Sequence, residues 1–219
     1  MSDIFQEVDE EVRRDKAAQF WKKYQNLIFA GVALIVLGTA GYRFYENRML
    51  AAEQAAGAAY EQALALERAG KDVDAEAAFA RLAADAPGGY QTLARLASAG
   101  VRATSDRDGA LRAYDALAAD SSIGPLFRDA ARLRAALLRL DAGQADAAKP
   151  ALEALAGPDA PYRNTARLAL GVIALDAADY EGAGKWLDLV VADDGAPEVE
   201  KKSAQSLLGL VAANRPAAK

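Results

Sequence analysis

The stretch that decides the fold is residues 168–190, LALGVIALDAADYEGAGKWLDLV. Its apolar residues recur at the spacing of one helix face, and a short break separates two such helices. Ala183 lies just after the break, Leu187 follows four positions later, and Val190 follows three positions after that. This spacing predicts a helical hairpin, because the small side chain lets the second helix approach the first and the large ones fill the gap between successive hairpins.

The same pattern of one small and two large residues occurs four times. The alanines are Ala75, Ala110, Ala148 and Ala183, the first large residues are Phe79, Tyr114, Leu152 and Leu187, and the second are Leu82, Leu117, Leu155 and Val190. The alanines are separated by 35, 38 and 35 residues, close to the roughly 34 residues of a tetratricopeptide repeat. Leu170-Gly171 and Asp179-Tyr180-Glu181 also resemble that repeat's consensus. We therefore expect an all-α protein whose hairpins form a right-handed, tetratricopeptide-like solenoid.

Turn residues and prolines mark the ends of the predicted helices. Gly70, Gly143 and Ala178 each stand five positions before a repeat alanine, where a short connection between helices is required. The second unit has the polar loop 104–106 instead, so its register can differ by a residue or two. Pro87, Pro125, Pro161 and Pro197 fall between hairpins, where helices must break and restart. The predicted helices are 50–69, 72–85, 89–102, 107–119, 126–142, 145–156, 162–177 and 180–192, with a capping helix at 198–213 and a disordered tail at 214–219.

Residues 24–42 form an uncharged apolar run. Their number matches the roughly 20 residues that a helix needs to cross about 30 Å of hydrocarbon. Aromatic residues favour the headgroup layer, and they flank this run at both ends: Trp21, Tyr24, Tyr42, Phe44 and Tyr45. A buried helix of a soluble core is the alternative, but the run lacks a polar face. We expect a transmembrane helix that continues without a break into the first hairpin, since no glycine or proline interrupts residues 43–56.

The leader, residues 1–23, argues against a cleaved signal peptide. A secretory leader begins with a short basic region, whereas this one carries six acidic residues and an amphipathic pattern at Ile4, Phe5, Val8 and Val12. Gly38 and Ala40 could otherwise precede a cleavage site. We expect an anchor that stays attached.

The orientation of the anchor follows from the lysines and arginines beside it. Five precede the run (Arg13, Arg14, Lys16, Lys22 and Lys23), and two follow it closely (Arg43 and Arg48). The more basic side stays cytoplasmic. The expected organisation in a bacterial inner membrane is therefore a cytoplasmic segment at 1–23, a transmembrane helix at 24–42 and a periplasmic repeat domain at 46–213.

The composition argues against catalysis and nucleic-acid binding. The chain has no histidine and no cysteine, and its net charge is -5. The commonest general base and metal ligand are thus absent, and the overall acidity is unsuited to phosphate backbones. Asp193-Asp194 is the only adjacent carboxylate pair in the repeats, and we interpret it as a solvated turn. Gly88-Gly89 lacks the preceding strand and following lysine of a phosphate loop. We predict no enzymatic activity, cofactor, metal or small-molecule substrate.

In tetratricopeptide arrays the first helix of each hairpin lines a concave groove. Counting from the repeat alanines, this resemblance implies groove positions at Tyr60, Leu64, Thr92, Arg95, Leu133, Leu137, Leu168 and Val172. An apolar groove of this kind suits extended or unfolded polypeptide. Alternatively, these side chains pack against neighbouring helices or the capping helix.

The whole layout, from Trp21-Lys22-Lys23-Tyr24 before the apolar run to the last repeat near Val190, resembles the ancillary SecYEG translocon subunits that carry a tetratricopeptide-like domain. That resemblance implies attachment to the Sec translocon and membership of a periplasmic chaperone network that receives emerging chains. The repeats are also similar to those of a periplasmic coordinator of cell division, which is secreted through a signal peptide. A structural organiser of an envelope or cell-division complex, without clients, is therefore the alternative. In both cases the partners are proteins.

Overall fold

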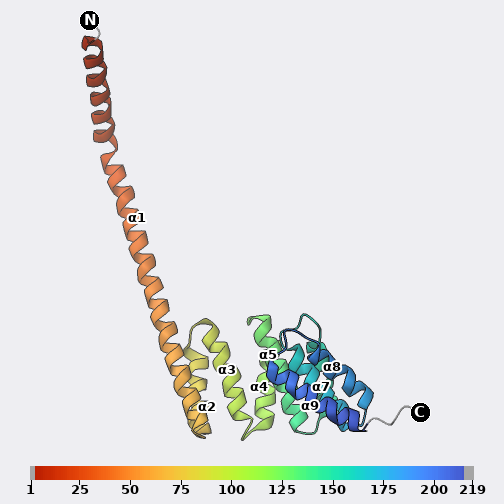
Figure 1. Ribbon diagram of the computed structural model, residues 1–219. Helices are drawn as coiled ribbons and strands as arrows, with labels where there is room; N and C mark the ends of the chain where they lie inside the picture. The colour runs from red at the N-terminus through yellow and green to blue at the C-terminus, as the bar shows by residue number, and fades with distance from the viewer. Residues whose placement is uncertain (1–2, 215–219) are drawn as a thin grey trace. The chain divides into compact units, whose positions relative to one another are not determined.

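The computed structural model describes the backbone of residues 3–214, and this part of the chain contains nine α-helices and no strand (Figure 1). The helices are α1 (Asp3–Arg68), α2 (Asp72–Asp85), α3 (Gly88–Arg102), α4 (Arg107–Ala119), α5 (Pro125–Asp141), α6 (Ala145–Leu155), α7 (Arg163–Asp176), α8 (Tyr180–Val191) and α9 (Glu198–Asn214). The predicted all-α class is confirmed, and α2 to α9 begin and end within one residue of the predicted bounds. The chain divides into two compact units, Met1–Gln54 and Ala55–Lys219.

The first unit consists of α1 up to Gln54. From Arg13 onward, α1 contains an apolar window with a mean hydropathy of 1.8, none of which is buried. Leu27, Leu34 and Leu37 each expose more than 70% of their surface. Its length and composition make α1 a candidate membrane-spanning helix, although a signal sequence would pass the same test. The leader is helical as predicted, and the side chains of Ile4, Phe5, Val8 and Val12 lie outside the described residues.

The second unit stacks its helices in chain order. Each helix from α2 to α8 packs against the next one along the chain, and α9 contacts both α7 and α8. The last part of α1 packs on α2, where the rings of Tyr60 and Phe79 meet edge to face with centroids 5.3 Å apart. The unit is therefore a tetratricopeptide-like solenoid, as predicted.

The repeat positions form the core of this solenoid. All four repeat alanines are completely buried, and so are Phe79, Leu152, Leu187 and Val190. The other large repeat residues, Leu82, Tyr114, Leu117 and Leu155, are at most 8% exposed. Burying one such side chain contributes roughly 1.5–3 kcal/mol, so the recurring pattern marks the residues that hold successive helices together.

In three of the four hairpins the predicted turn residue adopts a left-handed conformation. Gly70, Gly143 and Ala178 have φ angles of +70°, +74° and +58°. Each turn closes with two backbone hydrogen bonds; in the last one the Asp179 N–H donates to Ala174 at 2.8 Å and the Ala178 N–H donates to Leu175 at 2.9 Å. These bonds satisfy the carbonyls at the helix end.

The second hairpin turns differently. Its connection, residues 103–106, is one residue longer than the three-residue connections of the other hairpins. The Asp106 carboxylate accepts a hydrogen bond from the Gly109 N–H at 2.8 Å and so caps α4, which satisfies a free donor at the helix start.

The helix α9 closes the array, as predicted. Its Ala204 and Val211 join a core cluster with Leu187 and Val190 of α8. This contact covers apolar surface that an unfinished stack would leave in water. Asn214, which was predicted to belong to the tail, is the last residue of α9, and residues 215–219 lie outside the described part of the chain.

Candidate protein-binding groove

A pocket of about 480 Å³ opens among α1, α3 and α5 in the second unit. Most of the residues that line it carry apolar or aromatic side chains: Tyr60 and Leu64 from α1, Leu93, Leu96, Ala97 and Gly100 from α3, Tyr114 from α4 and Ala130 from α5. Glu67 and Arg134 add one charge of each sign. This volume falls within the range of about 300–1,000 Å³ typical of ligand pockets.

A second pocket, of about 170 Å³, adjoins the first between α3 and α5. The two share Gly100, Tyr114 and Arg134, and the second adds Ala103, Leu137, Leu138 and Asp141. Together they form one surface, called here the trough and defined by the residues that line the two pockets. The trough follows the first helices of the first three hairpins.

The charges of the trough alternate along it. Glu67 lies in the larger pocket, Asp141 lies in the smaller one, and Arg134 lines both. Burial raises the pKa of Tyr114, an effect that Arg134 partly offsets and Glu67 reinforces. Burial, with the charges of Glu67 and Glu61, also raises the pKa of Tyr60. Both phenols are therefore neutral at pH 7, and the three charged side chains set the local field.

The structure brings together three of the predicted groove residues and separates the others. Tyr60, Leu64 and Leu137 line the trough. Arg95 instead lines a different pocket, of about 280 Å³, between α2, α3 and α4, and its guanidinium donates to the Asp120 carboxylate at 2.8 Å. Thr92 is buried at 8% exposure. Arg95 stands 15 positions before Ala110, as Tyr60 does before Ala75, but in α3 the adjacent Leu96 lines the trough instead.

The remaining predicted positions lie in packed surfaces. Leu133 is only 6% exposed and belongs to the core cluster of α5, α6 and α7, while its neighbour Arg134 faces the trough. Leu168 packs on the cluster formed by α8 and α9. Val172 is half-buried and lies outside both pockets of the trough. The alternative placement, packing against neighbouring helices or the cap, thus describes Leu133 and Leu168.

Sequence reasoning did not assign Leu93, Leu96, Tyr114 or Arg134 to the groove. Tyr114 was identified only as a core residue of the repeat, yet its ring is buried while the residue also lines both pockets. An added Cβ at Gly100 would lie 3.2 Å from the Tyr114 hydroxyl. The sequence signal that could have placed Tyr114 beside the groove is Gly100, because a glycine in the first helix leaves room for a tyrosine of the second helix.

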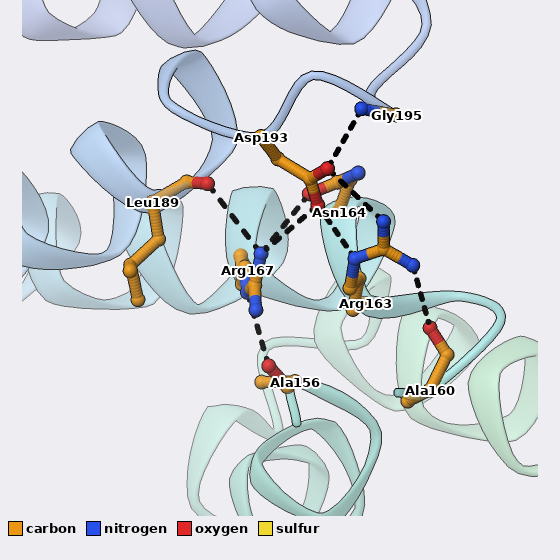
Figure 2. Close-up of polar contacts among 8 residues, drawn as sticks. All are labelled: Ala156, Ala160, Arg163, Asn164, Arg167, Leu189, Asp193 and Gly195. Carbon is orange, nitrogen blue, oxygen red and sulfur yellow. Dashed lines mark hydrogen bonds and ion pairs between the residues drawn. The ribbon is translucent and has the colours of Figure 1, made fainter. Parts of the chain in front are cut away.

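Asp193 corrects part of another prediction: its side chain is only 13% exposed, whereas Asp194 is exposed in the turn as predicted. The Asp193 carboxylate accepts hydrogen bonds from Arg163 at 2.5 and 3.0 Å and from the Gly195 N–H at 2.9 Å (Figure 2). These contacts, with Arg163 the strongest, hold the pKa of the Asp193 carboxyl well below its usual range. Arg167 also reaches it at 3.3 Å.

This network connects three helices and serves stability. Arg167 is buried, and its Nε donates to the Ala156 carbonyl at the end of α6 at 3.0 Å (Figure 2). Its Nη1 lies 3.4 Å from the Leu189 carbonyl of α8. The network thus satisfies backbone acceptors in two helices that flank α7. In the described residues, no three acidic side chains are grouped so as to hold a metal ion.

Stacked helical hairpins with an open trough along their first helices define a scaffold of the tetratricopeptide type. The Tetratricopeptide repeat-like domain family matches residues 18–159, more than half of the chain. The chain therefore belongs to this family, whose domains are protein-interaction scaffolds. The match includes the apolar part of α1 and ends after α6. No curated protein and no solved structure matches the chain.

Proposed function

We propose that this protein is a membrane-anchored scaffold that binds polypeptide through the trough. The observation that carries the proposal is the open pocket in which half-buried Leu64, Leu93 and Leu96 from two different helices are gathered. Surfaces of this kind favour burial against a partner. The predicted residues Tyr60, Leu64 and Leu137 belong to this site, and Arg134 replaces the predicted Arg95 as its cation.

The proposed topology places residues 1–23 in the cytoplasm, residues 24–42 in the inner membrane and the repeats, 46–213, in the periplasm. Five basic residues before the apolar run against two after it support this orientation. The chain has no cysteine, so single cysteines introduced at exposed Lys16 and Ser206 report their side cleanly. An impermeant maleimide should label Ser206→Cys in intact spheroplasts and Lys16→Cys only after lysis; the reverse pattern would refute the orientation.

The more specific proposal is an ancillary subunit of the Sec translocon, or a member of the periplasmic chaperone network, that contacts emerging or unfolded chains. Its support is the resemblance of leader, apolar run and repeats to that family. A photo-crosslinking residue at Leu96, in the trough, should form adducts with translocon subunits and nascent secretory chains. The same residue at Val73, which is 83% exposed and outside both pockets of the trough, is the matched control. Equal adducts at both positions would contradict binding through the trough.

An aggregation assay separates this proposal from the alternative, a structural organiser without clients. The repeat region, residues 46–219, should slow the aggregation of an unfolded test protein if it holds clients. Replacement of Leu96 by lysine should weaken this effect, because a charge would lie in the apolar wall. A repeat region that leaves aggregation unchanged at excess would favour the organiser.

A further inference from the structure

The trough contains three charged side chains in addition to its apolar residues. Glu67, Arg134 and Asp141 lie in the order negative, positive, negative from the α1 side of the larger pocket to the smaller pocket. Arg134 is exposed and lines both pockets. Its position between the two acidic residues is where a ligand with the opposite pattern would place an acidic group.

The two pockets of the trough form successive hollows. The larger, of about 480 Å³, and the smaller, of about 170 Å³, meet at Gly100, Tyr114 and Arg134. An extended backbone presents alternate side chains to the same surface, so one such chain can place side chains in both hollows.

The arrangement of the apolar parts sets the register of such a chain. One part lies between α1 and α3, at Leu64, Leu93 and Leu96, and the other lies on α5, at Leu137 and Leu138. Arg134 lines both pockets and so lies where the two parts meet. Apolar side chains at positions i and i+4 of an extended chain that reach the two parts place side chain i+2, on the same face of the chain, beside Arg134.

We propose that the trough selects an extended segment with apolar side chains at positions i and i+4, an acidic side chain at i+2 that pairs with Arg134, and basic residues just outside that face Glu67 and Asp141. This inference rests on the proposed function and specifies its ligand. The chain thus distinguishes among unfolded segments by charge as well as by hydrophobicity.

The test uses the full chain in lipid nanodiscs, with empty nanodiscs as the blank, and labelled nonapeptides. The first probe is Lys-Ser-Leu-Ser-Asp-Ser-Leu-Ser-Lys, in which the lysines share a face with the leucines and the aspartate, and its companion has lysine in place of the central aspartate. The native chain should bind the aspartate probe about tenfold more tightly, since the exchange replaces attraction to Arg134 by repulsion. Non-specific attraction to a chain of net charge -5 would instead favour the lysine probe.

Arg134→Glu should reverse the preference, and this exchange of charges distinguishes a direct pair from a general loss of folding. Arg112→Glu is the matched control: Arg112 is exposed on α4 and lies outside both pockets of the trough, so the substitution changes net charge equally and should leave the preference unchanged. If the native chain and Arg134→Glu both bound the two probes equally well, the inferred selectivity would be wrong. Peptide binding, which is the proposed function, would still stand. Absence of binding by either probe, together with no trough-specific adducts at Leu96, would overturn both proposals.

Discussion

Replacement of Gly171 by alanine should destabilise the repeats, although alanine is the better helix former. Gly171 lies inside α7, where a Cβ would stand 2.7 Å from Cδ2 and 2.8 Å from Cγ of Leu187. Leu187 is completely buried, so its side chain cannot move aside without disturbing its neighbours. Overpacking of a core typically costs about 1–3 kcal/mol, whereas exchange of glycine for alanine in a helix gains about 1 kcal/mol.

A second glycine provides the control for the gain in helix propensity. Gly209 lies inside α9, and a Cβ there would meet nothing within 4 Å. Gly209→Ala should therefore stabilise the chain by about 0.5–1 kcal/mol. The difference between the two substitutions isolates the steric effect, and we expect Gly171→Ala to be less stable than Gly209→Ala by about 1–3 kcal/mol.

The assay is denaturant unfolding of the full chain in detergent, followed by tryptophan fluorescence. The chain has two tryptophans, Trp21 in the first unit and Trp186 in α8, where it packs on the core of α5, α6 and α7. A Trp21→Phe background leaves Trp186 as the only tryptophan and thus reports the repeats alone. If Gly171→Ala stabilised the repeats as much as Gly209→Ala, the close approach of α7 and α8 inferred here would be wrong.

Three further substitutions test other parts of the structure in the same background. Ala178→Gly should raise the free energy of unfolding by about 0.5–1 kcal/mol, because the left-handed φ of +58° strains any residue with a Cβ; an unchanged denaturation midpoint would contradict this. Arg167→Met should lower it by about 2–4 kcal/mol, since the Ala156 carbonyl loses its buried donor, and a smaller loss than about 1 kcal/mol would show that water replaces it. Hydrogen bonds from Ser122 and Arg95 lower the pKa of Asp120 to about 2 from its ordinary 3.8, so its contribution to stability is present above pH 3.8 and is lost as the pH falls towards 2. Asp120→Asn should accordingly make the melting temperature depend less on pH in that interval. If the native chain and the variant showed the same dependence of melting temperature on pH, Asp120 would not be the group responsible.

The fold could be predicted from the sequence because packing itself imposes the repeat. Ala148 must be small for two helices to approach and Leu152 must be large to fill the space beyond, and both are completely buried. The turns carry their own local signal, since Gly143 occupies a conformation that few other residues tolerate. Helix bounds therefore agreed within one residue from α2 onward.

The groove could be predicted only in part, because a helix turns about 100° per residue. An error of one position carries a side chain from the groove to the core, and this separates exposed Arg134 from buried Leu133. The same error of one position separates Arg95, which stands as far before Ala110 as Tyr60 does before Ala75, from Leu96, which lines the trough. Asp193 was misjudged for a related reason: the arginines that surround it lie at least 26 residues earlier in the chain.

The cap explains why the trough does not continue along the whole array. Leu168 and Val172 stand at the same distances before their repeat alanine as Tyr60 and Leu64 do before theirs. In the last hairpin, however, α9 packs against α7: the Thr165 hydroxyl donates to Glu200 at 2.7 Å, and Leu168 packs on the cluster that contains Val211. A solenoid must cover the apolar face of its last unit, and the equivalent face in α1, α3 and α5 stays open only because each is followed by another hairpin rather than by a cap. Leu168 of α7, which fits the groove pattern, thus serves stability, and the proposed polypeptide-binding surface is restricted to the first three hairpins.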